Sequence, residues 1–245
     1  MPTPEPYAKR TAQGMILGAD GEKMSKSRGN VVNPDEIIAE IGADAFRMYE
    51  MFMGAFDQAI PWSTNGARGC RKFLDRVWRL QDMLTPGDGY SEDIKVSLHQ
   101  TIKKVTEDFE KMKFNTAIAQ MMTLVNEIYQ KGSLTAGEYR TLLLLLSPVS
   151  PHICEEIWQE QGYGEPVYTQ PWPKFDEKYL VRDEVEIAVQ LNGKVKGKLM
   201  VPVTMTKETA QEELPKLDAV KALIGDKQIV KCIYVPGRLL NLVVK

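Results

Sequence analysis

The chain has 245 residues and a formal net charge of −2, with 43% hydrophobic and 26% charged residues. This ordinary globular mixture argues against disorder and collagen-like repeats, and the near-zero charge means that a nucleic acid would have to be bound by local basic patches. The three cysteines (Cys70, Cys154 and Cys232) lie far apart and form no CxxC pair, which argues against a disulfide scaffold or a zinc site and favours a reducing cytoplasm.

The first 62 residues are predicted to form short elements around one polar loop. Residues 1–6 include three prolines, which predict an irregular arm. A short strand over 13–17 and a loop over 18–30, rich in Gly, Ser, Asp and Lys, follow. Asn33 and Pro34 suit the cap and first position of a helix that ends near Glu40, and a second helix is expected over 44–53.

Residues 63–176 have the apolar spacing of amphipathic helices. The predicted helices cover 64–84, 91–111, 115–130, 134–146 and 152–161. Short connections between them predict an antiparallel bundle. The longest apolar run, Leu142 to Leu146, is too short to cross a bilayer, so we expect no membrane partner. Residues 162–178, which contain three prolines, are expected to form an extended linker.

The last segment, residues 177–245, changes to strand patterning. Apolar residues alternate over 184–191, and Asn192-Gly193 is the strongest short signal for a hairpin. One or two helices are expected over 206–223 and a second hairpin over 228–244, which gives a small α+β domain of order ββαββ. The predicted fold is therefore multi-domain and mainly α, with domains at 1–62, 63–176 and 177–245.

The sharpest chemical signal lies in the polar loop. The string Lys23-Met24-Ser25-Lys26-Ser27-Arg28-Gly29-Asn30 holds three cations and two hydroxyls, and Gly21 and Gly29 flank them. Lysines supply point charges, hydroxyl and backbone N–H groups supply oriented donors, and glycine lets the backbone approach closely, so the loop could wrap a polyphosphate. A solvated basic turn is the alternative on composition alone.

KMSKS followed by RGNVVNPDEII resembles the second signature of class I aminoacyl-tRNA synthetases. The longer ordered string resembles the bacterial leucyl-tRNA synthetases in particular and covers essentially the whole chain. Its other segments are Gln13 to Gly18, Gly42 to Arg47, Pro61 to Ser63, Phe114 to Ile118, Leu146 to His152, Val189 to Lys194, and Asn241 to Lys245.

The resemblance implies that the loop closes over ATP while the amino-acid carboxylate attacks the α-phosphate and pyrophosphate leaves. The resemblance implies two catalytic residues, of which Lys26 is the stronger candidate and Lys23 the second. It also implies that the ATP phosphates are bound by Lys23, Met24, Ser25, Lys26 and Ser27. The implied partners are tRNA(Leu) and ATP, with Mg²⁺ expected in the full enzyme. No metal site is expected in this chain, because no His or Cys stands at ligand spacing from its acidic pairs.

One departure from the family limits the expected activity. The family needs a HIGH-type histidine sequence on a Rossmann catalytic domain, but the only histidines are His99 and His152, and neither lies in such a string. We expect His99 to be exposed and His152 to be a capping or core residue. The chain resembles only the C-terminal portion, so leucine would be reached through the missing N-terminal catalytic domain, and the chain alone is expected to be inactive.

The resemblance also implies that the bundle is of the anticodon-binding type and that it supplies tRNA docking. An expressed fragment or a split gene product would explain the missing domains. Two alternatives stay open: a free-standing, non-catalytic tRNA-binding module, and a fragment of a valyl-, isoleucyl- or methionyl-type synthetase, which share the loop and a bundle.

Two sets of cations are candidate RNA contacts. The helix predicted from residue 64 has a basic side, and every second residue after the predicted hairpin turn is a lysine, which predicts one cationic strand face. The alternatives are a solvated helix face paired with Asp75 and Asp82, and edge-strand protection by lysine. The candidate residues are Arg68, Arg71, Lys72 and Arg79 on the helix, and Lys194, Lys196 and Lys198 on the strand.

Overall fold

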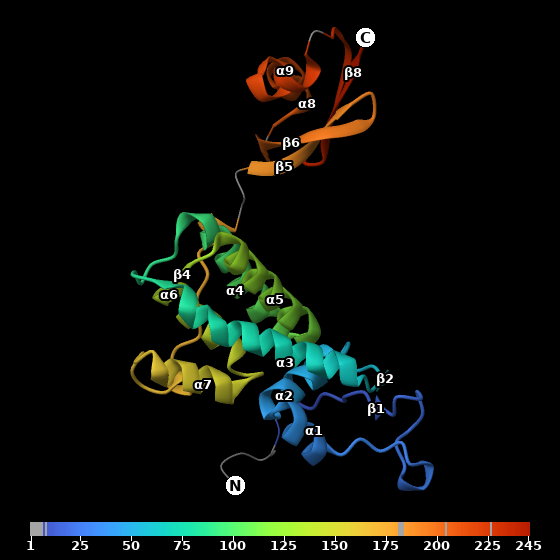
Figure 1. The fold of residues 1–245 in the computed structure, drawn as a ribbon, viewed down its shortest axis with the longest axis vertical. Coiled ribbons are helices and arrows are strands. Elements are labelled where there is room, and N and C mark those ends of the chain that lie inside the picture. The colour runs from blue at the N-terminus through green and yellow to red at the C-terminus, as the bar shows by residue number, and fades with distance from the viewer. Residues whose placement is uncertain (1–6, 8, 181–183, 204, 226) are drawn as a thin grey trace. The chain divides into compact units, whose positions relative to one another are not determined.

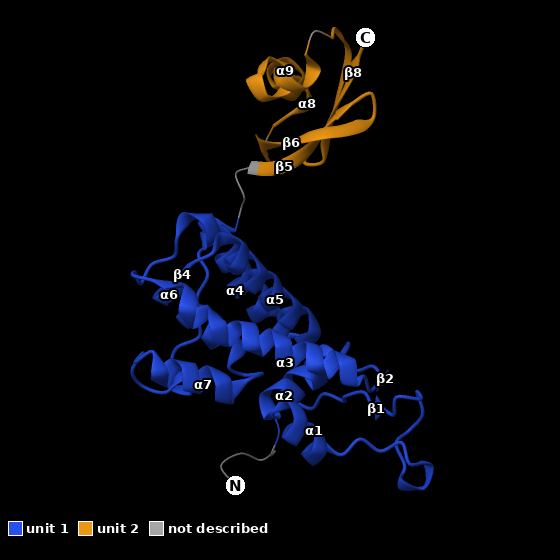
Figure 2. Ribbon diagram, viewed as in Figure 1, with its two compact units in different colours: residues 1–180 blue, residues 181–245 orange. Residues whose placement is uncertain are grey.

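The computed structural model describes residues 7, 9–180, 184–203, 205–225 and 227–245. Its contacts divide the chain into two compact units, residues 1–180 and 181–245 (Figure 2). The irregular arm expected over residues 1–6 lies outside the described residues. The further division at residue 62 stays a prediction.

The first unit begins with a short two-strand pairing and two helices (Figure 1). Strand β1 (Ile16–Leu17) pairs in parallel with β2 (Ile60–Pro61). Helix α1 (Pro34–Ile41) starts as predicted, because the Asn33 side chain accepts a hydrogen bond from the backbone N–H of Asp35 and Pro34 opens the helix. Gly42, with φ of 88°, separates α1 from α2 (Ala43–Phe52).

The bundle follows the predicted periodicity closely. Its helices are α3 (Thr64–Arg79), α4 (Glu92–Glu110), α5 (Phe114–Lys131), α6 (Ala136–Leu146) and α7 (Pro151–Glu160). Two residues each of β3 (Leu84–Thr85) and β4 (Leu134–Thr135) pair in parallel where the α3 and α5 connections meet. Apolar residues of α1 to α7 form one buried cluster in which Tyr139, Leu142 and Leu143 are fully buried. Burial of this apolar cluster contributes most of the stability of the unit.

Residues 162–180 differ from the predicted extended linker, because they pack against the bundle. Two 3₁₀ turns, Val167–Thr169 and Glu177–Tyr179, shape this strap. Val167 is buried, and the Trp172 indole donates a hydrogen bond to the Thr106 hydroxyl at 2.8 Å. The boundary between the two units accordingly falls after Leu180.

The described part of the second unit is a four-stranded sheet with helices on one face. The sheet order is β6-β5-β8-β7, with β5 and β8 parallel and the outer pairs antiparallel. Apolar residues of α8 and α9 and of the covered sheet face form a separate core that includes Ile187, Leu214 and Leu240. The elements are β5 (Glu184–Leu191), β6 (Lys194–Pro202), α8 (Lys207–Glu213), α9 (Asp218–Ile224), β7 (Ile229–Val235) and β8 (Leu239–Val244).

The predicted Asn-Gly hairpin is confirmed. Asn192 has φ of 49° and Gly193 has φ of 80°, the pair of left-handed conformations that a two-residue turn of this type requires. The helical region divides at Pro215, which lies in a 3₁₀ turn between α8 and α9.

Candidate functional site

The polar loop runs between β1 and α1 and contains one 3₁₀ turn, Lys26–Arg28. Ser25 is extended before the turn, and Gly29 ends it with φ of 68°, a conformation that glycine adopts without strain. The Met24 side chain packs against the apolar core. The loop is therefore anchored at Met24, while Lys23, Lys26, Ser27 and Arg28 are exposed.

The two candidate catalytic lysines are free of ion pairs within the described part of the chain. Lys23 and Lys26 are exposed, whereas the third cation, Arg28, lies 3.2 Å from Glu22. The Ser25 and Ser27 hydroxyl oxygens are 2.7 Å apart. The loop therefore presents two uncompensated ammonium groups beside two hydroxyls, a set of donors suited to phosphate oxygens.

The Asn30 side chain forms hydrogen bonds across this loop, a feature that the sequence did not predict. The Asn30 side chain contacts both Asp20 and the backbone on either side of Met24. The pKa of Asp20 is lowered, chiefly because its carboxylate accepts a hydrogen bond from the Glu22 backbone N–H, with further help from Asn30. Asn30 is part of the matched family string, but its sequence context gave no sign of a cross-loop contact.

The candidate RNA cations of α3 fall into two pairs. Arg68 lies 2.6 Å from Glu40, and Arg71 lies 2.8 Å from Asp75. Arg71 also donates to the Ile41 carbonyl at the end of α1. Lys72 and Arg79 are exposed and have no ion-pair partner among the described residues.

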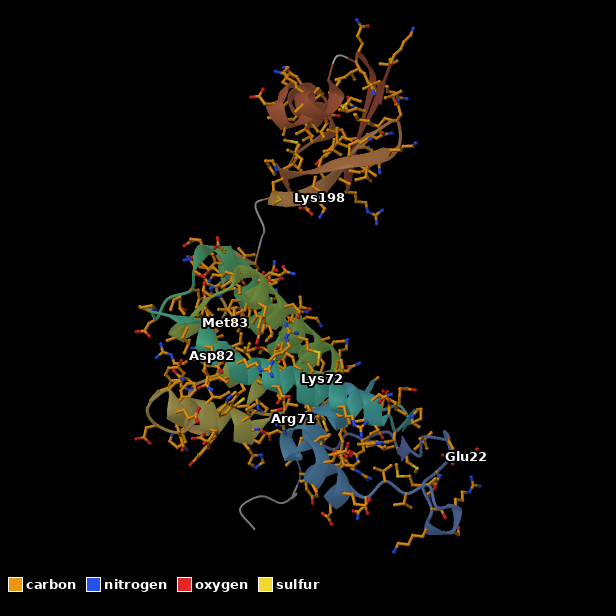
Figure 3. All side chains as sticks on the ribbon, in the orientation of Figure 1. Glu22, Arg71, Lys72, Asp82, Met83 and Lys198 are labelled. Carbon is orange, nitrogen blue, oxygen red and sulfur yellow. The ribbon has the colours of Figure 1, made fainter. Side chains whose placement is uncertain are left out.

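Two of the four cations are therefore ion-paired, Arg68 with Glu40 of α1 and Arg71 with Asp75 of α3 itself, and two remain open to a ligand. Figure 3 shows Arg71 and Lys72 along α3, while Glu22 lies apart from them in the loop. The ion pairs are solvent-exposed, so each contributes little to stability. Their carboxylates do, however, reduce the local positive potential at Arg68 and Arg71.

The prediction that the three strand lysines share one face is wrong, because β6 contains a bulge. Gln190 pairs with Val195 but Val189 pairs with Gly197, so Lys196 is an extra residue. Lys194 consequently pairs with Leu191, on the helix-covered face, whereas Lys198 pairs with Ala188 on the other face. Val195, the apolar residue between Lys194 and Lys196, is 61% exposed.

All three lysines remain exposed at the surface of the second unit. Lys198, labelled in Figure 3, forms an ion pair of 2.7 Å with Glu186 on β5. Lys194 and Lys196 have no acidic partner among the residues that the structure describes. These two cations at the β5–β6 hairpin are the stronger candidates for contact with phosphate.

The histidine predictions had different outcomes. The prediction that His99 is exposed is wrong: it is 7% exposed, because the strap covers it, and its Nδ1 accepts a hydrogen bond from the Asp176 backbone N–H. Burial lowers the pKa of His99. The prediction that His152 is a core residue is wrong, because its side chain is 74% exposed. Its ring contacts the Asp44 carboxylate at 2.7 Å. The capping role belongs to Asp44, which accepts hydrogen bonds from the first backbone N–H groups of α7.

Histidine, cysteine and acidic side chains in the described ranges form no group of three or more that could hold a metal ion. No described helix is long and apolar enough to span a membrane.

Comparison with known proteins shows which class of protein the chain is similar to. Residues 1–63 match the family "tRNA synthetases class I (I, L, M and V)". Residues 92–211 match the anticodon-binding domain of tRNA ligase, a match that runs from the bundle into the second unit. Together these matches, over residues 1–63 and 92–211, show that the chain is similar to class I aminoacyl-tRNA synthetases.

Two relatives that match the whole of this chain show which member of the class it is most similar to among those compared. The chain is 51% identical, over all of its residues, to a leucine–tRNA ligase of Alkaliphilus oremlandii, of which it covers 30%. It aligns along its whole length with 34% of a LeuRS of Agrobacterium radiobacter solved in a ternary complex with tRNA and LeuAMS, with a TM-score of 0.69 and 32% identity. The chain is homologous to leucine–tRNA ligase and spans about a third of the length of these relatives.

Proposed function

We propose that the chain is the C-terminal part of a leucine–tRNA ligase, in which it supplies the KMSKS loop for ATP-dependent leucyl-adenylate formation and surfaces that dock tRNA(Leu). The observation that carries this proposal is the pair of uncompensated lysines, Lys23 and Lys26, on a loop that belongs to the same compact unit as the bundle. A loop that acts on ATP and a bundle that docks tRNA would then move as parts of one enzyme.

In this proposal the loop acts by electrostatic stabilisation. When the leucine carboxylate attacks the α-phosphate, negative charge builds up on the departing pyrophosphate. The ammonium groups of Lys26 and Lys23 would lie against that charge, and the Ser25 and Ser27 hydroxyls would donate hydrogen bonds to phosphate oxygens. Charged donors fixed before the reaction contribute most where charge develops in the transition state.

The proposed tRNA contacts are made to phosphates rather than to bases. Lys72 and Arg79 on α3 and Lys194 and Lys196 on the second unit are exposed and uncompensated by described acids. From Asn192 onward the chain has ten Lys and Arg against five Asp and Glu, which suits a folded RNA backbone. Contacts of this kind recognise shape and charge and carry little base readout.

The remaining parts of the reaction would come from the portion of the ligase that precedes this homologous region. A Rossmann domain there would bind leucine and the adenine and ribose of ATP, and Mg²⁺ would neutralise phosphate charge. We accordingly propose that the chain alone forms no adenylate and that the assembled enzyme acts in the cytoplasm.

Complementation tests this function. The chain is mixed with, or joined to, the preceding catalytic portion of a leucine–tRNA ligase, and charging of tRNA(Leu) with leucine is measured. Restored charging supports the proposal, and the matched Lys26→Ala chain should restore tRNA binding but little adenylate formation. Tight tRNA binding with no rescue of charging would instead support a free-standing binding module, and rescue only with valine, isoleucine or methionine enzymes would contradict the leucine assignment.

A further inference from the structure

The Asn30 side chain connects three separate points of the KMSKS loop. Its Oδ1 accepts a hydrogen bond from the Ser25 backbone N–H at 2.8 Å. Its Nδ2 donates to the Asp20 carboxylate at 3.0 and 3.2 Å and lies 3.4 Å from the Lys23 carbonyl oxygen. One amide thereby holds the peptide groups on both sides of Met24 and ties them to the opposite arm of the loop.

The loop is shaped to admit this contact. Gly18 lies directly beside the Asp20–Asn30 pair, and a Cβ at this position would come within 2.6 Å of Asp20 Oδ1 and 2.8 Å of Asn30 Nδ2. Asp20 Oδ1 also accepts from the Glu22 backbone N–H at 3.1 Å, which orients the carboxylate toward Asn30. The absent side chain at Gly18 and the oriented acid at Asp20 both serve the same contact.

We propose that Asn30 is a positioning residue for adenylate formation, and that with Asp20 it fixes the backbone from which Lys23 and Lys26 reach the phosphates. This inference rests on the proposed function of the loop. Lys23 carries the bridged carbonyl, and Lys26 follows the bridged Ser25 N–H and begins the 3₁₀ turn. Both ammonium groups therefore extend from backbone that the Asn30 amide holds in one conformation.

A polarity swap tests the proposal. Asn30→Asp retains the acceptor for the Ser25 N–H but sets two carboxylates against each other, because Asp20 faces it at hydrogen-bond distance. The double variant Asp20→Asn with Asn30→Asp restores a donor–acceptor pair with its direction reversed, and it leaves the net charge at the wild-type value. Asn65→Asp, on the exposed start of α3, is the matched control.

In the complemented enzyme, ATP–pyrophosphate exchange should separate positioning from folding. We expect Asn30→Asp to lower kcat about ten-fold, the scale of one or two lost hydrogen bonds, with a much smaller change in the KM for ATP. The double variant should recover much of the lost kcat, because it restores the pair between positions 20 and 30 and keeps the acceptor for the Ser25 N–H. Recovery should be incomplete, because an aspartate at position 30 cannot donate to the Lys23 carbonyl. A single variant with wild-type kcat, or a double variant no better than Asn30→Asp, would overturn the proposal.

A second measurement uses the chain alone and does not depend on catalysis. Hydrogen exchange at the Ser25 amide should be slow in the wild type, faster in Asn30→Ala, and slow again in the double variant. If the wild-type complemented enzyme shows no pyrophosphate exchange, the proposed function fails, whereas an unprotected Ser25 amide in the wild-type chain contradicts the bridge itself.

Discussion

The Asn192 side chain makes both hydrogen bonds of a strand pair with the backbone of Val244. Its Oδ1 accepts from the Val244 N–H at 2.9 Å, and its Nδ2 donates to the Val244 carbonyl at 3.1 Å. Asn192 belongs to the turn after β5, so its amide extends the parallel β5–β8 pairing beyond the last backbone pair, Leu191 with Leu242. The turn residue therefore also secures the C-terminal strand.

Substitution at Asn192 separates these two roles. Asn192→Gly keeps the left-handed turn but removes both bonds to Val244, and Asn192→Ala also adds strain at φ of 49°. We expect Asn192→Gly to lower the free energy of unfolding of the second unit by about 1–2 kcal/mol, and Asn192→Ala to lower it by about 1 kcal/mol more. Hydrogen exchange of a peptide covering β8 measures this, and equal protection in all three proteins would contradict the role assigned to the amide.

Glu138 joins four groups at the start of α6. Its carboxylate accepts from the Thr135 and Ser91 backbone N–H groups at 2.9 and 2.7 Å, contacts the Ser91 hydroxyl, and lies 3.4 Å from Lys131 Nζ. The side chain is fully buried. The acid therefore links the ends of three helices, α4, α5 and α6.

Removing this acid should be costly. Glu138→Ala leaves buried backbone donors unsatisfied and the Lys131 ammonium without its acidic partner, so we expect a loss of about 3–5 kcal/mol in the free energy of unfolding. Glu138→Gln keeps the shape and one acceptor and should lose less. All four tryptophans lie in the first unit, so tryptophan fluorescence in urea reports on this unit alone; a Glu138→Ala midpoint equal to that of Gln would refute the network.

Local signals predicted most of the fold. The cap at Asn33, the apolar spacing of α3 to α7 and the Asn192-Gly193 turn each act through neighbours within about one helical turn or one hairpin, so the sequence reveals them directly. The strap was predicted only as a linker, because Trp172 finds its partner at Thr106 on another element. Such distant pairings leave no mark on local periodicity.

The same limit explains the errors at the candidate sites. Alternation placed Lys194 and Lys198 on one face, but the bulge at Lys196 depends on how β6 pairs with β5. Arg68 was expected to be open to RNA, although Glu40, which it contacts, belongs to a different helix. Lys23 and Lys26 could be proposed without knowledge of distant contacts, because their proposed role rests on a contiguous sequence motif.

Acid should weaken the first unit through His99. Burial lowers the pKa of this imidazole below its ordinary 6.5, and nearby Lys95 and Lys178 act in the same direction against an opposing effect of Asp176. The unfolded chain therefore binds more protons than the folded one below about pH 6.5, and stability falls as the pH decreases from there to the lowered folded-state pKa. Protonation would also remove the acceptor for the Asp176 N–H.

His99→Gln removes this titration. We expect the urea midpoint of the wild type to fall further than that of His99→Gln when the pH is lowered through that window, with tryptophan fluorescence as the measurement. Parallel midpoints for the two proteins at every pH would show that His99 does not carry the acid sensitivity.

Gly18→Ala should disturb the loop without unfolding the unit. The added methyl group would lie 2.6 Å from Asp20 Oδ1, so the Asp20–Asn30 pair must separate. Gly69→Ala is the matched control, because a Cβ there meets nothing within 4 Å and alanine favours the α3 helix. We expect faster exchange at the Ser25 amide only in Gly18→Ala, with the urea midpoint of the unit unchanged; faster exchange in both variants would point to a general loosening instead.

The two cation pairs of α3 should differ in how they affect tRNA binding. Each lysine or arginine that neutralises a phosphate releases counterions, so it adds close to one to the slope of log K against log salt. Replacing Lys72 and Arg79 by Ala should therefore make the salt dependence less steep, with the slope smaller in magnitude by up to about two. Replacing Arg68 and Arg71 should lower it less, because Glu40 and Asp75 already compensate their charge. Filter binding of tRNA(Leu) across a salt series measures both slopes, and a larger change from the Arg68 and Arg71 variant would mean that the ion pairs open to admit RNA.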